Sequence, residues 1–197
     1  FLTEGKGVIG AVGIDESGRI YVFRAKSTIL ATGGAGHIYL RTSNAAGSTG
    51  DGFALAYYAG VPLVDMEFVQ FATSGPDTDV FCAREGGVIR NRLGENILEK
   101  HGITDPVRMT RSAVARAMML EILAGNSPDG MTLTLDTTPI SEERFEALRV
   151  LLPRNTPRDR RHFSVGLHAH FFMGGIKINE PAETGLDRLY AAGEVCG

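Results

Sequence analysis

The sequence predicts a fold of mixed α+β and α/β type, in which one glycine-rich unit is interrupted by an inserted domain. Residues 29–36 and 190–197 each read as a short buried strand that runs into glycines, and together they bracket most of the sequence. Residues 76–157 have fewer glycine-ended strands and more charges. An interruption of roughly 80 residues is a plausible size for one inserted domain. The expected divisions are residues 1–75, 76–162 and 163–197.

The composition is that of an ordinary globular protein. Of 197 residues, 43% are hydrophobic and 22% are charged, and the net charge is −3. This balance gives no reason to expect binding to nucleic acid. No apolar run approaches the roughly 20 residues of a membrane-spanning helix. Cys82 and Cys196 have neither metal-ligand spacing nor a disulfide pattern, so we expect reduced thiols in the cytoplasm and no metal site.

The first and last divisions are expected to supply the glycine-ended strands. A turn signal between two apolar runs predicts a β-hairpin, and the strand that follows is apolar enough to be buried on both faces. Gly60 is expected to end the first helix. In order, the expected elements are strands at residues 7–14, 19–24 and 27–32, a helix at 53–59, and strands at 67–72, 174–179 and 189–192.

The inserted division is expected to contain a long helix over residues 110–124. Val114, Met118 and Ile122 recur at intervals of four, and Arg111 lies one turn before Val114 on the same face. A strand is expected at residues 131–136, and a second helix is expected to open at Ser141, which has a capping signature.

Glycines at the ends of strands let backbone amides approach a ligand without an intervening Cβ atom. Gly33 and Gly34 follow the strand at residues 27–32, and Asp51 lies between two glycines at the start of a helix. Asp51 has two interpretations: its carboxylate accepts hydrogen bonds from a ribose or ribityl hydroxyl, or it is an N-cap that satisfies helix amides.

Five motifs in order resemble the flavoprotein subunit of the succinate dehydrogenase/fumarate reductase family, which includes L-aspartate oxidase. The resemblance covers nearly the whole chain and is weakest in the inserted division. The motifs are residues 31–36, 49–56, 60–70, 170–176 and 189–194.

The resemblance implies an internal fragment of a Rossmann-type FAD-binding domain with an inserted α+β capping domain. The family's glycine fingerprint for the ADP half of FAD would lie upstream, so we expect the chain alone to bind FAD weakly, if at all. The residues matched to FAD contacts are Ala31, Thr32, Gly33, Gly34, Asp51, Gly193 and Glu194.

The resemblance also implies the residues that act on substrate. Arg111 matches the family's proton-donating arginine, and His170 matches the histidine that binds a substrate carboxylate. Without the family, Arg111 would pair with a buried acid and His170 would be a core histidine. His168 has no family counterpart and is expected only to pack.

Several positions depart from the family pattern. A carboxylate-binding histidine is replaced by Ala72, and Arg84 lies one place after the position of a relay arginine. The clamping threonine, the relay glutamate and that arginine become Asp79, Val80 and Ala83. Residues that could line a pocket for another substrate are Thr73, Ser74, Arg84 and Arg90.

The implied parent enzyme transfers hydride between flavin and a small carboxylate such as fumarate or succinate. The alternatives are an L-aspartate oxidase or a diverged flavin dehydrogenase and, in another class, a non-catalytic capping or structural domain. The family implies iron–sulfur and membrane-anchor subunits as partners of some members, with the flavoprotein in the cytoplasm or on the cytoplasmic face of a membrane.

Overall fold

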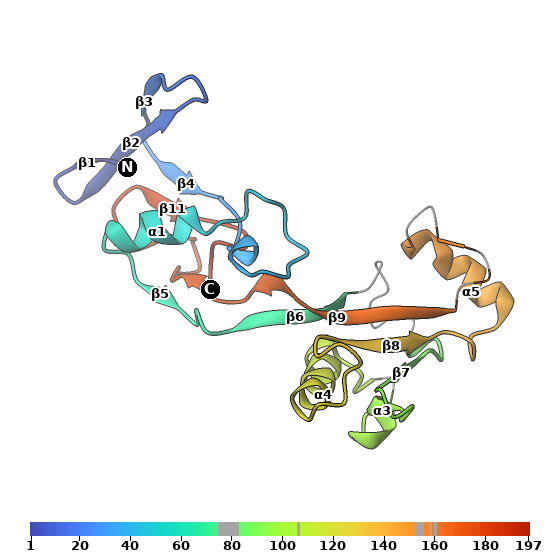
Figure 1. Cartoon of the computed structure of the whole chain (residues 1–197). Helices are drawn as coiled ribbons and strands as arrows, with labels where there is room; N and C mark the ends of the chain where they lie inside the picture. Colours follow the sequence, from blue (N-terminus) through green and yellow to red (C-terminus); the bar gives the residue numbers. More distant parts are fainter. Residues whose placement is uncertain (75–82, 106, 153–155, 158, 160) are drawn as a thin grey trace. The chain divides into compact units, whose positions relative to one another are not determined.

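The structure is a computed structural model that describes the chain except for residues 75–82, 106, 153–155, 158 and 160. The described residues form two compact units (Figure 1). The first unit joins Phe1–Gln70 to His170–Gly197, and the second comprises Phe71–Ala169. The compact units therefore divide after Gln70 and Ala169, and the domain boundaries expected after residues 75 and 162 stay a prediction.

The first unit begins with a three-stranded antiparallel sheet in the order β1-β2-β3. Asp15 closes the turn between β2 and β3 by accepting hydrogen bonds from the backbone amides of Ser17 and Arg19, at 2.9 and 3.0 Å. The predicted β-hairpin is therefore confirmed. The strands are β1 (Leu2–Glu4), β2 (Gly7–Ile14) and β3 (Ile20–Arg24).

Two strands far apart in the sequence pair in parallel in the first unit. They are β4 (Thr28–Leu30) and β11 (Leu189–Ala191), with Leu30 opposite Ala191. Their carboxyl ends therefore lie side by side, as Figure 1 shows. The other elements are η1 (Gly36–Ile38), α1 (Asp51–Tyr58), β5 (Leu63–Val64) and β10 (Gly175–Ile176).

A single apolar cluster holds the first unit together. Val8, Leu189 and Val195 are at most 1% exposed, and Phe53 of α1 packs in the same cluster. The prediction that β4 is buried on both faces is wrong, because Ile29 is 65% exposed. Parallel strands are buried where layers cover both faces, and the described residues cover one face of β4.

The second unit has its own core around an antiparallel sheet. The sheet order is β6-β9-β8-β7. Val114 and Met118 of the long helix are fully buried against it, with Phe145 and Phe163. The elements are β6 (Val69–Ser74), β7 (Val88–Arg90), α3 (Ile97–Lys100), α4 (Arg111–Leu123), β8 (Thr132–Asp136), α5 (Glu142–Leu148), η2 (Arg149–Leu151) and β9 (His162–Phe172).

A buried carboxylate lies on the inner face of α4. Glu121 is 2% exposed and is surrounded by hydrogen-bond donors. Burial by itself would raise its pKa, but these hydrogen bonds outweigh burial and lower the pKa to about 2. Glu121 therefore stays ionised inside the unit. Its donors are Asn91 at 2.8 Å, His101 at 2.9 Å, Asn126 at 2.9 Å and Lys100 at 3.3 Å.

Candidate functional site

The turns that follow β4 and β11 meet in the first unit. The Ala192 amide donates a hydrogen bond to the Leu30 carbonyl at 2.9 Å, which extends the parallel ladder into the turns. A Cβ atom on Gly34 would lie 2.4 Å from Oε1 of Glu194, so a larger residue at position 34 would displace the Glu194 carboxylate. That oxygen also accepts a hydrogen bond from the Phe172 amide at 2.8 Å. The predicted turn at Gly33–Gly34 and the predicted residue Glu194 are thus neighbours.

The amino end of α1 packs against the same place. A Cβ atom on Gly52 would lie 1.8 Å from Oγ1 of Thr32 and 2.9 Å from Cγ2 of Val195. The helix therefore approaches both glycine turns at its first turn. A helix amino end presents free amides and a partial positive charge, which suits a phosphate or another anion.

The structure corrects one interpretation of Asp51. Asp51 is the first residue of α1, and Gly50 occupies the N-cap position with no side-chain capping hydrogen bond. The carboxylate of Asp51 is exposed, and it accepts a hydrogen bond from the Thr49 hydroxyl at 2.7 Å. Asp51 is not the N-cap, and its exposed carboxylate can accept hydrogen bonds from a hydroxyl-bearing ligand.

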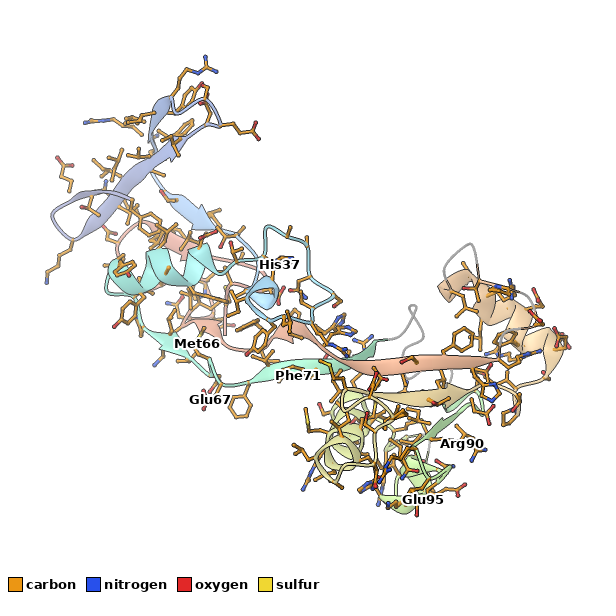
Figure 2. The ribbon with its side chains drawn as sticks, in the orientation of Figure 1. His37, Met66, Glu67, Phe71, Arg90 and Glu95 are labelled. Carbon is orange, nitrogen blue, oxygen red and sulfur yellow. The ribbon has the colours of Figure 1, made fainter. Side chains whose placement is uncertain are left out.

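The predicted cofactor residues thus come from three segments of one unit. Ala31 and Thr32 are exposed directly after β4, and Gly193 lies in the turn after β11. His37 of η1, labelled in Figure 2, follows the same glycine run. The segments brought together are residues 31–34, the amino end of α1 and residues 193–194.

His170 lies at the carboxyl end of β9, in the first unit. Its Nδ1 atom shares a hydrogen bond with the Ser43 hydroxyl at 2.8 Å, and its carbonyl accepts one from Asn44 at 2.7 Å. Sequence reasoning did not identify Ser43 or Asn44. The residue type alone could not, because serine and asparagine in a loop more often serve turns.

Arg111 is the first residue of α4, in the second unit. Its neighbour Thr110 is the N-cap, and the Thr110 hydroxyl accepts a hydrogen bond from the Ala113 amide at 3.2 Å. Arg84 reaches the same helix end, because its guanidinium donates to the Met109 carbonyl at 2.9 Å. The described residues therefore bring two arginines to the start of α4.

The positions that depart from the family pattern differ in burial and in their contacts. Ala72 and Ala83 are buried, at 3% and 6% exposure. Arg90, shown in Figure 2, pairs with Asp136 across β7 and β8 at 3.1 Å. Burial opposes ionisation of Asp136, but the hydrogen bonds from Thr138 and Arg90 lower its pKa. The predictions made for Asp79 and Val80 lie outside the described residues.

Two further predicted residues are buried in the second unit. Thr73 is 6% exposed and His168 is 9% exposed. In the described ranges, no group of three or more His, Cys, Asp or Glu side chains could hold a metal ion. A search of the same ranges for a helix long and apolar enough to cross a membrane finds none.

A protein-family model described as an FAD binding domain matches residues 1–197. The chain is 38% identical to one of the subunits of fumarate reductase (CoM/CoB) from Methanothermobacter marburgensis over 211 aligned positions, which cover all of this chain and 38% of that protein. It is 36% identical to L-aspartate oxidase of Halobacterium salinarum, covering 86% of this chain and 34% of that protein. The chain therefore spans less than two fifths of the length of these relatives.

The chain is also similar to solved structures of proteins named as fumarate reductase and Sdh1. The chain is similar to E. coli quinol fumarate reductase FrdA with a TM-score of 0.83 and 29% identity, over 99% of this chain and 38% of that one. It is also similar to Mycobacterium smegmatis Sdh1 in complex with UQ1, with a TM-score of 0.78 and 30% identity, over 99% of this chain and 35% of that one.

Proposed function

This chain belongs to the FAD binding domain family, and from that premise we propose that its parent protein is an oxidoreductase acting on a small dicarboxylate such as fumarate or succinate. The family match confirms the predicted cofactor, FAD. The observation that carries the proposal is the meeting of the two glycine turns at Gly34 and Glu194.

The residues of the first unit fit FAD. The exposed carboxylate of Asp51 would accept hydrogen bonds from sugar or ribityl hydroxyls, and the turn at Thr32, Gly33 and Gly34 would offer amides without a Cβ atom in the way. Glu194 would tie its turn to the end of β9 through the Phe172 amide. When bound, FAD supplies the hydride chemistry.

Two residues are assigned to the substrate from the family pattern. His170 would donate a hydrogen bond to one substrate carboxylate, and Arg111 would bind or protonate the substrate from the amino end of α4. A guanidinium gives up a proton only with strong local help. Arg84, held at the Met109 carbonyl, brings a second guanidinium to the start of the same helix, which would favour binding of an anionic substrate there.

We test the role of Arg111 in the FAD-loaded parent protein. Arg111→Ala should lower kcat by roughly 10²- to 10⁴-fold, the usual contribution of a positioned proton donor, while FAD stays bound. Arg116→Ala is the matched control, because Arg116 is an exposed residue of the same helix. Undiminished turnover in Arg111→Ala would remove this residue from the mechanism.

A second candidate substrate is L-aspartate. The relative from Halobacterium salinarum carries that oxidase name at 36% identity. Ala72 offers no hydrogen bond to a carboxylate where the family pattern has a histidine, so either dicarboxylate would need another residue to bind that group. Comparison of kcat/KM for succinate, fumarate and L-aspartate in the parent separates the two candidates.

The proposal extends to partners and location. One relative is named as part of a multi-subunit fumarate reductase (CoM/CoB), which supports further subunits for the parent, iron–sulfur and membrane-anchor subunits among them. The parent would work in the cytoplasm or on the cytoplasmic face of a membrane. Co-purification of the tagged parent with such subunits from its native host tests the proposed partners.

A further inference from the structure

Two consecutive residues of the loop between η1 and α1, Ser43 and Asn44, form hydrogen bonds with His170 near the end of β9. Asn44 donates a hydrogen bond from its side-chain amide to the His170 carbonyl at 2.7 Å. Ser43 shares a hydrogen bond with Nδ1 of the His170 ring at 2.8 Å. One residue therefore fixes the main chain of His170, and the other fixes its ring.

The position of this loop is itself constrained by packing. A Cβ atom on Gly36 would lie 2.3 Å from Cγ of Asn44, so the Asn44 side chain fits closely against a residue without a side chain. Because Asn44 is anchored at Gly36 and at residue 170, the neighbouring Ser43 hydroxyl is delivered to the ring at a fixed distance.

The hydrogen bond at Nδ1 has a chemical consequence at the other ring nitrogen. A neutral imidazole carries its hydrogen on one nitrogen, and a hydroxyl partner either donates to the bare nitrogen or accepts from the nitrogen that carries the hydrogen. A carboxylate accepts hydrogen bonds and donates none when ionised. His170 can bind a carboxylate through Nε2 only if that atom carries the hydrogen.

We propose that Ser43 is a positioning residue: its hydroxyl donates to Nδ1 of His170, which leaves the ring hydrogen on Nε2, the atom that would donate to a substrate carboxylate. This inference rests on the proposed function of His170. Ser43 itself does not touch the substrate in this account. It acts through the tautomer and orientation of the histidine ring.

The first test reads the tautomer directly in the FAD-loaded parent protein. Nitrogen-15 spectra of labelled histidine, with the His170 signals assigned by their loss in His170→Gln, should show Nδ1 without a hydrogen. Ser43→Ala should give a mixture of both tautomers, and Ser43→Thr should restore a single one. A hydrogen on Nδ1 in the unsubstituted protein would overturn the inference.

The second test measures binding of malonate, a dicarboxylate that cannot be desaturated, by its effect on the flavin spectrum. Ser43→Ala should weaken binding by roughly fivefold, the value of one lost hydrogen bond. Ser43→Thr and the control Ser27→Ala, an exposed serine of the same unit, should bind normally. Normal binding by Ser43→Ala, beside lost binding by His170→Ala, overturns the inference. Normal binding by His170→Ala instead overturns the proposed function of His170. In that case the nitrogen-15 spectra still test whether Ser43 sets the tautomer of the His170 ring.

Discussion

At the scale of single residues, the motifs of the sequence identified side chains that the structure brings together. Thr32 and Gly34 lie in one predicted segment and Glu194 lies in another. They are neighbours because Gly34 and Gly52 have no Cβ atom, so Glu194 and Thr32 can pack directly against them. Ser43 and Asn44 could not be named in this way. Their partner, His170, is more than a hundred positions away, and nothing in a polar loop indicates a contact at that distance.

Glu121 is another residue that the sequence does not reveal, because the residue pattern of α4 predicts an apolar face with one arginine. A glutamate on that face is stable only because four side chains donate to it. Glu121→Gln loses the charge-assisted part of these bonds. We expect the free energy of unfolding at neutral pH to fall by about 1–3 kcal/mol. Urea unfolding measures this, with the exposed Glu99→Gln as control.

The same residue predicts a pH dependence. The pKa of Glu121 is lowered in the folded protein from 4.5 to about 2. Its contribution to stability is therefore complete above its unfolded pKa, and it is lost as the pH falls from about 4.5 toward 2. Unfolding midpoints measured between neutral pH and pH 3 should fall less steeply in Glu121→Gln. Parallel curves for both proteins would contradict the assignment.

At the scale of elements, most strands and helices of the first unit follow from the sequence. The hairpin, β4 and β11 lie where apolar runs meet turn signals. In the second unit, α4 agrees with its prediction within one residue at each end. β9 was not predicted, because Gly166, His168 and His170 interrupt its apolar pattern. β10 is shorter than its predicted strand and covers Gly175–Ile176.

The amino end of α1 gives a prediction at this scale. Replacing glycine by alanine inside a helix normally stabilises it by about 1 kcal/mol. In Gly52→Ala, the new Cβ atom would meet Thr32 Oγ1, so we expect a loss of about 1–3 kcal/mol instead. Chemical unfolding of the chain measures whether the free energy of unfolding falls or rises in Gly52→Ala. The control Ala54→Gly, at an exposed site of the same helix, should lose about 0.5–1 kcal/mol. Stabilisation by Gly52→Ala would refute the close packing.

At the scale of the whole molecule, the mixed fold and the FAD assignment were both predictable. They were predictable because a nucleotide-binding turn needs glycines at the ends of strands, and that requirement survives in the sequence. The exposure of Ile29 was not predictable, since it depends on which layers surround β4 and not on the strand itself. The chain spans 38% of the length of one relative. The activity of the whole protein is therefore a proposal that experiments on the parent must test.

The most direct test of the account is the affinity of the parent protein for FAD after Asp51→Ala. This side chain is exposed and accepts a hydrogen bond from Thr49, so its removal should leave the unfolding midpoint nearly unchanged. If α1 and the two glycine turns hold FAD, the dissociation constant measured by flavin fluorescence should rise roughly tenfold or more, as expected for a lost charged hydrogen bond. The exposed Glu180→Ala should bind normally. Unchanged FAD affinity in a folded Asp51→Ala protein would contradict the account.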